Sequence, residues 1–357
     1  MEGALGLARR GLGAVWPNPS VGCIIVREGR VVGRGWTQAG GRPHAETEAL
    51  RRAEALAKGA VVFVSLEPCA HQGETASCAD ALISAGVSRV VVAAGDPDPR
   101  VNGKGMACLA DAGIEVVTEV CRAAAEEVNA GYLSRTTKGR PLVTLKLAAT
   151  LDGRIAGGRD RWITGPVARD RAHMLRAEHD VVMVGVGTVM ADDPRLDCRL
   201  PGMAPRSPVV VVVDGTLRSP VTCNLLAGPR RSPPWFVTLE SAEDKRRDEI
   251  CGRGAELIDV AAGADGRPDL ESALRALAGK GVTRVLVEGG GQLATTMIRR
   301  CLVDRLVWFH APKLLGDEGT PAISSLKFGE SEGTPEFRRI AVVEVGDDLM
   351  ETYAAQS

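Results

Sequence analysis

An alternation of strand-like and helix-like segments runs along the chain, stops at Gly139-Arg140-Pro141 and then starts again. Residues 60–65 form one of the short apolar runs typical of a buried strand, and residues 142–149 form another just after the break. The length of 357 residues also exceeds the usual size of one domain. We therefore expect two α/β domains, residues 1–140 and residues 141–357.

The first domain opens with a predicted hairpin, because two strand-like runs flank the turn-forming pair Glu28-Gly29. Strands interleaved with helices then continue to residue 137, which predicts a layered domain with helices packed on a sheet. The expected strands are residues 21–26, 30–35, 60–65, 90–94 and 115–118, and the expected helices are 45–58, 79–85, 105–112 and 122–137.

The second domain repeats the alternation, with expected strands at residues 142–149, 181–185, 209–213 and 285–288. Residues 288–292 form a glycine-rich turn between a buried strand and a predicted helix, 293–300, and such a turn lets backbone N–H groups approach an anion. Two later runs, 305–310 and 340–345, resemble strands without a long helix between them. They predict an antiparallel edge on a mixed sheet.

His44, Cys69 and Cys78 form a set of potential zinc ligands at the predicted ends of strands and helices. One imidazole and two thiolates leave the fourth tetrahedral position for water, as a catalytic zinc requires. Zinc-bound water ionises near pH ~7 and can attack an amidine-like ring carbon. Glu46, two residues beyond His44, is the natural proton carrier. The pattern predicts a deaminase acting on a base.

Other interpretations of the same residues stay open. An isolated His-x-Glu can arise by chance, and His71 could complete a closed structural zinc site. A deaminase acting on a flipped nucleic-acid base would use the same metal ligands, but a net charge of −1 and 3% aromatic residues disfavour strand binding. A non-catalytic, zinc-stabilised binding protein is disfavoured by the free fourth position and by Glu46.

Composition indicates a folded chain, and the lack of targeting or spanning segments, together with the cysteine content, leads us to expect it in the cytoplasm. Hydrophobic residues make up 45% and charged residues 25%, which is typical of a globular protein. We find no credible export signal, and the longest apolar runs are far below the ~20 residues that cross a bilayer. Nine cysteines suit reduced thiols. Seven of them are expected as small core residues: Cys23, Cys108, Cys121, Cys198, Cys223, Cys251 and Cys301.

The first domain resembles the pyrimidine deaminase part of the bifunctional deaminase/reductase family of riboflavin biosynthesis. The resemblance implies a cytidine-deaminase-like α/β/α fold, with Asn18 and His71 in contact with the pyrimidine. Outside that context the two residues would be a turn asparagine and a surface histidine. The resemblance rests on residues 17–23 (PNPSVGC), 44–46 (HAE), 66–73 (LEPCAHQG), Thr75, Cys78, 81–83 (ALI) and 96–99 (DPDP).

One departure from the family concerns recognition of the substrate phosphate. Glu74 stands where the family usually has a basic residue, and Ala76-Ser77 replace a common pair of prolines. A carboxylate facing a phosphate dianion would be repulsive. A protein with only the reductase activity, and with a deaminase domain impaired or retargeted by this loop, is therefore the alternative.

The second domain resembles the reductase half of the same family, which has a dihydrofolate-reductase-like fold and uses NADPH. A Rossmann site does not fit, because Gly185-Val186-Gly187 lacks the third glycine. The resemblance rests on residues 146–154, 161–164, 184–194, 286–293 and 311–316. It implies NADPH contacts from Ala148, Trp162, Thr188, Asp192, Gly290, Gly291, Gln292, Leu293, Ala294, Thr295 and Thr296.

The same resemblance implies a substrate site in the second domain. Lys146 and Glu288 are the candidate catalytic residues, which would polarise the ribose carbon and its ring oxygen as hydride arrives. Their alternative roles are a surface salt bridge and a strand-end carboxylate. The implied substrate-binding residues are Asp160, Arg176, Leu196, Arg199 and Glu288, of which the two arginines suit a sugar phosphate.

The sequence thus predicts two consecutive reactions on a small pyrimidine ribotide. Zn²⁺ would serve hydrolytic deamination of 2,5-diamino-6-(5-phosphoribosylamino)pyrimidin-4-one at its 2-amino group. NADPH would then reduce the ribosyl group to ribityl, giving 5-amino-6-(5-phosphoribitylamino)uracil. The family implies a homo-oligomer, and we expect neither a nucleic acid nor a membrane as partner.

Overall fold

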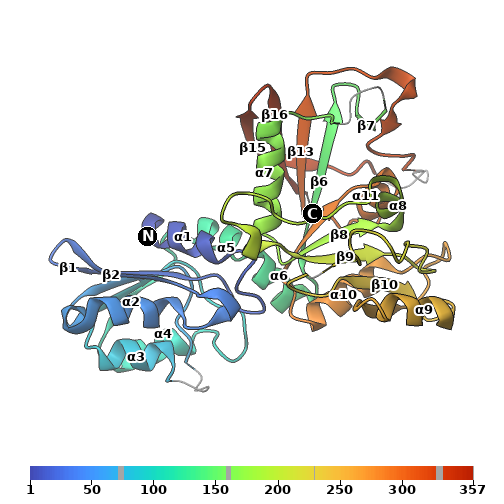
Figure 1. Cartoon of the computed structure of the whole chain (residues 1–357). Coiled ribbons are helices and arrows are strands. Elements are labelled where there is room, and N and C mark those ends of the chain that lie inside the picture. The colour runs from blue at the N-terminus through green and yellow to red at the C-terminus, as the bar shows by residue number, and fades with distance from the viewer. Residues whose placement is uncertain (71–75, 158–161, 229, 327–332, 357) are drawn as a thin grey trace. The chain divides into compact units, whose positions relative to one another are not determined.

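The chain divides between Arg140 and Pro141 into two compact units, which we call the first unit (Met1–Arg140) and the second unit (Pro141–Ser357). The computed structural model describes residues 1–70, 76–157, 162–228, 230–326 and 333–356 (Figure 1). Three residues with predicted roles, His71, Glu74 and Asp160, lie outside the described residues.

Five strands form the sheet of the first unit, in the order β2-β1-β3-β4-β5. β1 pairs antiparallel with β2 and with β3, whereas β3, β4 and β5 run parallel. The predicted hairpin is present, because β1 and β2 meet across the turn at Glu28 and Gly29. The strands are β1 (Gly22–Arg27), β2 (Arg30–Trp36), β3 (Val61–Val64), β4 (Arg89–Val92) and β5 (Glu115–Val117).

Helices cover both faces of this sheet, which confirms the layered α/β/α arrangement. In Figure 1, α2, α3 and α4 lie on one face of the sheet, and α1 and α5 lie on the other. The helices are α1 (Glu2–Ala8), α2 (Ala45–Ala53), α3 (Cys78–Ser84), α4 (Lys104–Asp111), α5 (Arg122–Val128) and α6 (Ala130–Lys138).

Two helices of the first unit are shorter than predicted. The helix expected over residues 45–58 ends at Ala53, since Glu54 has a φ of 48° and a 3₁₀ turn follows. The helix expected over residues 122–137 is interrupted at Asn129. The buried Asn129 side chain instead accepts a hydrogen bond from Ser20 N at 2.9 Å, so it serves the tertiary structure at the break.

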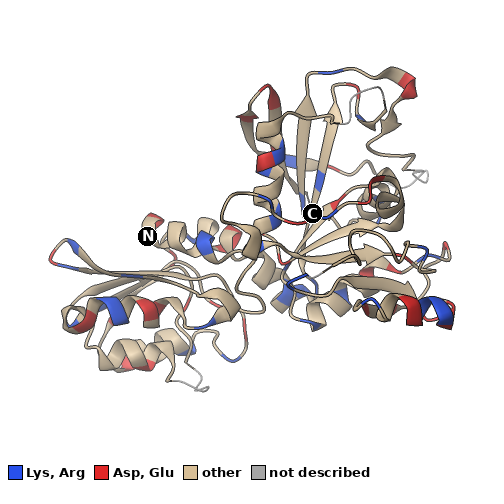
Figure 2. Ribbon diagram, in the orientation of Figure 1, with Lys and Arg blue, Asp and Glu red and all other residues tan. Residues whose placement is uncertain are grey.

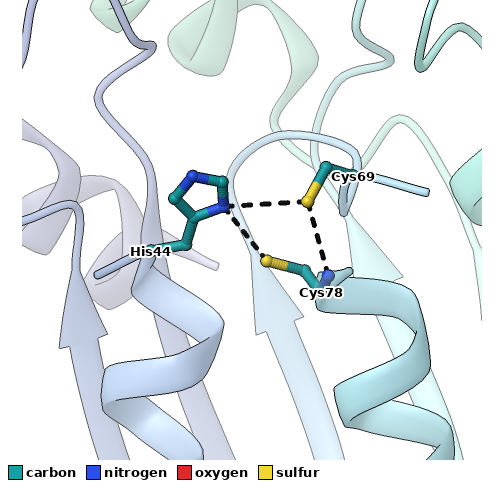
Figure 3. A group of neighbouring side chains, drawn as sticks. All are labelled: His44, Cys69 and Cys78. Atoms are coloured by element: carbon teal, nitrogen blue, oxygen red, sulfur yellow. Dashed lines mark hydrogen bonds between the residues drawn. The ribbon is translucent and has the colours of Figure 1, made fainter. Parts of the chain in front are cut away.

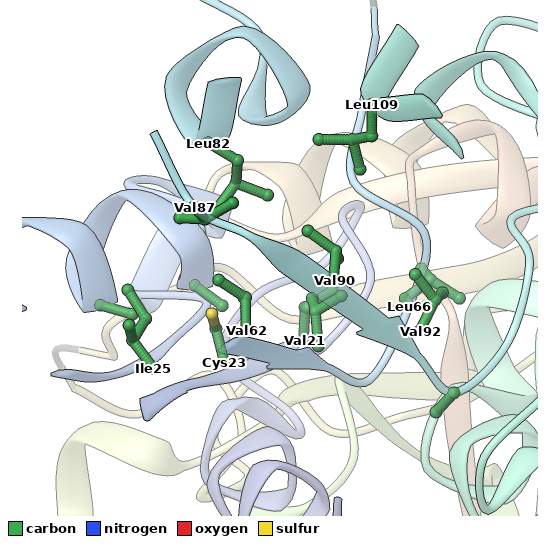
Figure 4. Close-up of a cluster of buried hydrophobic side chains, with 14 of the residues drawn as sticks. Val21, Cys23, Ile25, Val62, Leu66, Leu82, Val87, Val90, Val92 and Leu109 are labelled. Carbon is green, nitrogen blue, oxygen red and sulfur yellow. The ribbon is translucent and has the colours of Figure 1, made fainter. Parts of the chain in front are cut away.

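Alternate residues of the central strands fill the core of the first unit. Side chains of β1, β3 and β4 meet Leu82 of α3 and Leu109 of α4 (Figure 4). Cys23 of β1 is fully buried among them, as expected of a small core residue. The strands that precede the predicted metal ligands are therefore anchored by packing on both sides.

Nine strands form the main sheet of the second unit, in the order β11-β10-β9-β8-β12-β6-β13-β16-β15. The seven from β11 to β13 run parallel, as expected for strands joined by crossover helices. They are β6 (Leu142–Thr150), β8 (Val181–Gly185), β9 (Val209–Val213), β10 (Trp235–Leu239), β11 (Glu256–Val260), β12 (Arg284–Glu288) and β13 (Arg305–Ala311).

The antiparallel edge exists, and the predicted run at 340–345 lies in it. The run at 305–310 forms β13, which pairs parallel with β6 on one side, because a helix, α11 (Gly291–Arg299), crosses over between β12 and β13, and antiparallel with an edge strand on the other. The edge consists of β15 (Phe337–Val345) and β16 (Asp348–Ala355). β16 was not predicted from the sequence.

Helices cross between the parallel strands of the second unit. They are α7 (Pro166–Ala177), α8 (Val186–Asp192), α9 (Asp244–Cys251), α10 (Leu270–Gly279) and α11. A separate two-stranded sheet pairs β7 (Arg154–Ala156) with β14 (Thr320–Pro321).

The prediction that seven cysteines are core residues is wrong for four of them. Cys23, Cys198 and Cys223 are buried, and they do behave as small core side chains. The exposed four lie on helices or beside helix ends, where the chain reaches the surface: Cys108, Cys121, Cys251 and Cys301.

Charged residues of both signs are interspersed along the surface elements of both units (Figure 2). α9, for example, carries Asp244, Asp248 and Glu249 beside Lys245 and two arginines. Within the described ranges, none of the helices has both the length and the apolar character that a membrane span requires.

Candidate active sites

The three predicted zinc ligands lie at the ends of elements of the first unit. His44 is the N-cap residue of α2, and Cys78 is the first residue of α3. Cys69 lies on the segment that follows β3, where its carbonyl accepts a hydrogen bond from Ala79 N at 3.1 Å. Cys78 N also lies 3.4 Å from Cys69 Sγ, so the two cysteines are held side by side.

The three side chains point toward one another (Figure 3). His44 Nδ1 lies 3.2 Å from Cys78 Sγ and 3.7 Å from Cys69 Sγ, and all three ligand atoms lie within 4.8 Å of one another. Zinc bonds of 2.0–2.3 Å put tetrahedral ligand atoms roughly 3.5 Å apart. The donor set therefore fits one zinc ion and leaves one coordination position free of these side chains.

Glu46 lies in the first turn of α2, two residues after His44, and is almost fully buried. Burial raises the pKa of its carboxyl group. The hydrogen bond with Cys78 is the main cause that lowers the pKa of the Cys69 thiol to about 4. The site thus combines a thiolate ligand with a carboxyl group whose pKa is displaced toward neutrality, as an acid–base residue needs.

Glu67 is a supporting residue whose role the sequence did not indicate. Its buried carboxylate accepts hydrogen bonds from the backbone N–H groups of Gly103 and Gly105, both at 3.0 Å, and of Met106 at 3.3 Å. These donors lie at the N-terminus of α4, where a carboxylate is favourable. Glu67 therefore fixes the segment that carries Cys69. The only sequence signal for this supporting role was the position of Glu67 in the motif at residues 66–69 (LEPC).

Asn18, expected at the pyrimidine, lies against the segment that leads to His44. A Cβ atom on Gly41 would stand 1.9 Å from Asn18 Nδ2, and Gly41 has a φ of 88°. Only glycine lets the 41–44 segment pass so close to this side chain. Asn18 therefore packs against the segment that leads to His44, whereas His71 and Glu74 lie outside the part of the chain that the structure describes.

The two candidate catalytic residues of the second unit occupy paired positions on neighbouring parallel strands, Lys146 on β6 and Glu288 on β12. The Lys146 ammonium lies 5.5 Å from the centre of the Phe309 ring. Burial lowers the pKa of Lys146. Burial would raise the pKa of Glu288, but the charge of Arg176 outweighs it and brings the value to about 2.

Arg176, predicted to bind a sugar phosphate, is occupied by contacts within the protein. Nε lies 2.6 Å from Glu288 Oε1, Nη2 lies 2.8 Å from Glu288 Oε2, and Nη1 donates to Asp197 O at 3.0 Å. The structure thus places Arg176 as the partner of Glu288. Arg199, whose side chain is half exposed, is the more accessible of the two predicted arginines.

His173 is a further member of this cluster that sequence reasoning missed. Its Nδ1 lies 3.1 Å from Asp197 O, and its Nε2 lies 3.3 Å from Arg199 Nη2. The available signal was its position three residues before Arg176, which puts both on one face of α7. Leu196, by contrast, is buried in the hydrophobic core, with a φ of 55°.

A cavity of about 630 Å³ lies in the second unit at the carboxyl ends of β12, β8 and β9. Six of the predicted NADPH contacts line it: Thr188, Gly290, Gly291, Gln292, Leu293 and Thr296. The other five do not: Ala148, Trp162, Asp192, Ala294 and Thr295. Sequence reasoning also missed part of the lining, the segments 215–218 and 265–271.

The turn before α11 needs glycine because Thr188 stands against it. Gly289 has a φ of 103°, and a Cβ atom there would lie 3.0 Å from Thr188 Oγ1. Gly290, with a φ of 65°, is also close to that hydroxyl group. The backbone of this turn and the Thr188 side chain therefore meet at the edge of the cavity.

Two family models match the chain. The RibD C-terminal domain matches residues 141–350, and the cytidine and deoxycytidylate deaminase zinc-binding region matches residues 1–94. The riboflavin biosynthesis protein RibD of Bacillus amyloliquefaciens is 38% identical over 352 residues, covering 98% of this chain and 94% of the relative. The chain belongs to the RibD family.

Other RibD proteins match at similar levels. RibD of Escherichia coli K12 is 37% identical over 362 residues, which is 98% of this chain and 96% of the relative. The solved structure of Acinetobacter baumannii RibD covers 100% of this chain and 98% of its own, with a TM-score of 0.88 and 34% identity.

A solved protein from Thermotoga maritima has a TM-score of 0.85 and 32% identity, and covers 100% of this chain and 97% of its own. It is described as a diaminohydroxyphosphoribosylaminopyrimidine deaminase/5-amino-6-(5-phosphoribosylamino)uracil reductase. As a RibD family member, this chain is a bifunctional deaminase and reductase of riboflavin biosynthesis, with zinc and NADPH as its cofactors.

Proposed function

We propose that the first unit deaminates 2,5-diamino-6-(5-phosphoribosylamino)pyrimidin-4-one at its 2-amino group, and that the second unit reduces the ribosyl group of the product to ribityl. The final product would be 5-amino-6-(5-phosphoribitylamino)uracil. The observation that carries the first assignment is the cluster of His44, Cys69 and Cys78 with buried Glu46 beside it. The paired positions of Lys146 and Glu288 carry the second.

In the first unit, His44, Cys69 and Cys78 would hold the zinc ion. When bound, zinc supplies a water molecule that ionises near pH ~7. Glu46 would carry two protons in turn, the first from the water to the ring nitrogen and the second from the added hydroxyl group to the departing amino group, which its raised pKa favours. Asn18 orients the pyrimidine from the 41–44 side of the site.

In the second unit, Lys146 donates a proton toward the ribose ring oxygen as the ring opens, and its lowered pKa favours that donation. When bound, NADPH supplies the hydride for C1′. Glu288, ionised and held by Arg176, stabilises positive charge that develops at the sugar. Arg199 contacts the sugar phosphate, and the wall lined by Thr188 and Gly290 contacts the cofactor.

The test uses the zinc-loaded full chain beside Glu46→Gln and Glu288→Gln variants. Ammonia release from the diaminopyrimidinone ribotide is measured first, and NADPH oxidation is then followed with the deaminated product supplied. Each variant should lose its own half-reaction by about 10²- to 10⁴-fold and keep the other. NADPH oxidation without ammonia release, despite bound zinc, would instead indicate the reductase-only enzyme with a compromised Glu74 loop.

We also propose that the protein is a homo-oligomer. β15 lies at the end of the sheet, and its Ile340, Val342 and Val343 side chains are exposed. An exposed apolar edge strand of this kind is normally covered in the assembled protein. Size-exclusion chromatography with light scattering would give the mass of the protein in solution, and the mass of a monomer would contradict this proposal.

Finally, we propose that the enzyme works in the cytoplasm. None of the nine cysteines, all of which the structure describes, forms a disulfide, and four of them lie on the surface. Exposed free thiols persist in a reducing compartment. Fractionation of cells that produce the protein would test this, and recovery from an extracytoplasmic fraction would contradict it.

A further inference from the structure

The segment 193–199, which follows α8 in the second unit, forms neither a helix nor a strand. Its position therefore depends on individual contacts. The Leu196 side chain is buried in the core, and the Cys198 N–H group donates to Ser207 Oγ at 3.0 Å. The backbone that leads to Arg199 is thus fixed on both sides of residue 197.

One carbonyl group of this segment, Asp197 O, is held by α7. Arg176 Nη1 donates to it at 3.0 Å, and His173 Nδ1 lies 3.1 Å from it. His173 and Arg176 are three residues apart and therefore lie on one face of α7. This face of the helix anchors the segment two residues before Arg199, and both side chains contribute to the anchor.

The two arginines of this cluster differ in the donors that they leave for a ligand. Each guanidinium nitrogen of Arg176 contacts Glu288 or Asp197 O. The Arg199 side chain is half exposed. Among the described residues, its guanidinium group makes one hydrogen bond, to His173 Nε2 at 3.3 Å, and a looser ion pair with the Asp197 carboxylate at 3.6 Å. Because a guanidinium group has five N–H donors, most of those of Arg199 remain for a ligand.

The contact with Arg199 determines which nitrogen of the His173 ring carries the proton. Arginine only donates hydrogen bonds, so the Nε2 atom that faces it presents its lone pair. The proton is then on Nδ1, which donates it to Asp197 O, and the 3.4 Å approach of Arg199 N to Nδ1 is the weakest contact of the group. Burial, followed by the charges of Arg176 and Arg199, lowers the pKa of His173. One neutral ring therefore both anchors the segment and holds the Arg199 side chain.

We propose that His173 is a positioning residue, which presents the Arg199 guanidinium group to the phosphate of the reductase substrate. The proposal rests on the reductase function given above, in which Arg199 contacts the sugar phosphate. An arginine side chain that is already held loses less conformational entropy when a ligand binds. A neutral imidazole also leaves the positive charge of Arg199 available to the phosphate, whereas a carboxylate in the same place would offset it.

The experiment measures kcat and KM of the reductase in the full chain, with the deaminated ribotide as substrate and NADPH at saturation. His173→Ala should raise KM about ten-fold and leave kcat within about two-fold, because the phosphate is bound equally before and during hydride transfer. With the same substrate lacking its phosphate, the unaltered chain and His173→Ala should have equal kcat/KM. His310→Ala is the matched control, since His310 is a half-buried histidine of the same unit that pairs with Glu351 on β16.

Two conservative variants separate the two contacts of the ring. In His173→Gln the side-chain amide reaches about as far as Nε2, and its oxygen can accept from Arg199, so KM should return towards that of the unaltered chain. In His173→Asn the shorter amide reaches only the place of Nδ1, so KM should stay raised. If His173 served only to anchor Asp197 O, the Asn variant would restore KM better than the Gln variant, and the proposal would be wrong.

A double-mutant cycle with Arg199 completes the test. If His173 acts through Arg199, adding His173→Ala to Arg199→Ala should raise KM no further, and NADPH affinity from nicotinamide fluorescence should be the same in every variant. Additive increases in KM, an unchanged KM in His173→Ala, or equal losses in kcat and kcat/KM would overturn the proposal. If Arg199→Ala itself left KM unaltered, the phosphate contact assigned to Arg199 under the proposed function would fail, and the role of His173 with it.

Discussion

Arg176 holds Glu288 through two parallel hydrogen bonds, with Nε 2.6 Å from Oε1 and Nη2 2.8 Å from Oε2. The remaining Nη1 group donates to Asp197 O, so each guanidinium nitrogen has a partner. The pair is mostly buried, and Glu288 keeps its charge beside Lys146. Arg176 therefore affects the reaction by positioning the Glu288 carboxylate.

Arg176→Lys should reduce the rate of the reductase at least ten-fold and leave ammonia release intact. A lysine ammonium group cannot reproduce the two-point contact, so Glu288 would lose its fixed orientation. Disturbing a buried ion pair should also destabilise the second unit by about 3 kcal/mol. Arg171→Lys on the same helix is the control, since Arg171 is exposed. Equal reductase rates in the two variants would show that the contact is dispensable.

His179 should make the second unit less stable as the pH falls below 6.5. It is fully buried between Leu175 O, 2.7 Å from Nδ1, and Thr144 Oγ1, 2.9 Å from Nε2, and burial lowers its pKa to about 4. The unfolded chain takes up a proton near pH 6.5, whereas the folded chain does so only near pH 4, so stability falls across that window.

The measurement is urea unfolding of the second unit at several pH values between 7 and 4.5. The unaltered chain should lose about 2 kcal/mol more over this range than His179→Gln does. Working above pH 4.5 avoids a separate effect of Glu288. Because the pKa of Glu288 in the folded chain is lowered to about 2, its contribution to the free energy of unfolding is lost only as the pH falls from its usual pKa towards 2. Identical pH slopes for the two proteins would contradict the prediction.

Local spacing predicted the zinc ligands, because His44 and Cys78 stand at the starts of α2 and α3 and Cys69 lies on the segment after β3, and the sequence pattern reveals all three elements. The α/β alternation was predictable for the same reason. What remained hidden depends on partners far along the chain. Arg176 and Glu288 are 112 residues apart, and Asn129, where the helix breaks, accepts a hydrogen bond from Ser20, 109 residues away. No local pattern encodes such contacts, so the sequence indicated neither the ion pair of Arg176 with Glu288 nor the break in the helix.

Gly289→Ala should weaken NADPH binding at least ten-fold. Its φ of 103° is unfavourable for alanine, and the added Cβ atom would lie 3.0 Å from Thr188 Oγ1, so the turn and the hydroxyl group must move apart. Gly279→Ala is the matched control, because Gly279 is helical and has open space around it. Fluorescence titration with NADPH gives both affinities. A Gly289→Ala variant with unchanged affinity would mean that the turn does not contact the cofactor.

Glu67→Gln should loosen zinc binding about ten-fold while reductase activity stays constant. The Glu67 carboxylate accepts backbone hydrogen bonds from Gly103, Gly105 and Met106, and an amide in its place must turn one donor group toward these donors. The segment leading to Cys69 would shift, and supporting contacts of this kind typically change metal affinity 10- to 100-fold. Competition with a coloured chelator measures the affinity. Glu115→Gln, which removes only the surface pair with Arg89, should bind zinc as the unaltered chain does. If both variants retain zinc equally, packing alone fixes the Cys69 segment, and the carboxylate of Glu67 contributes only to the N-terminus of α4.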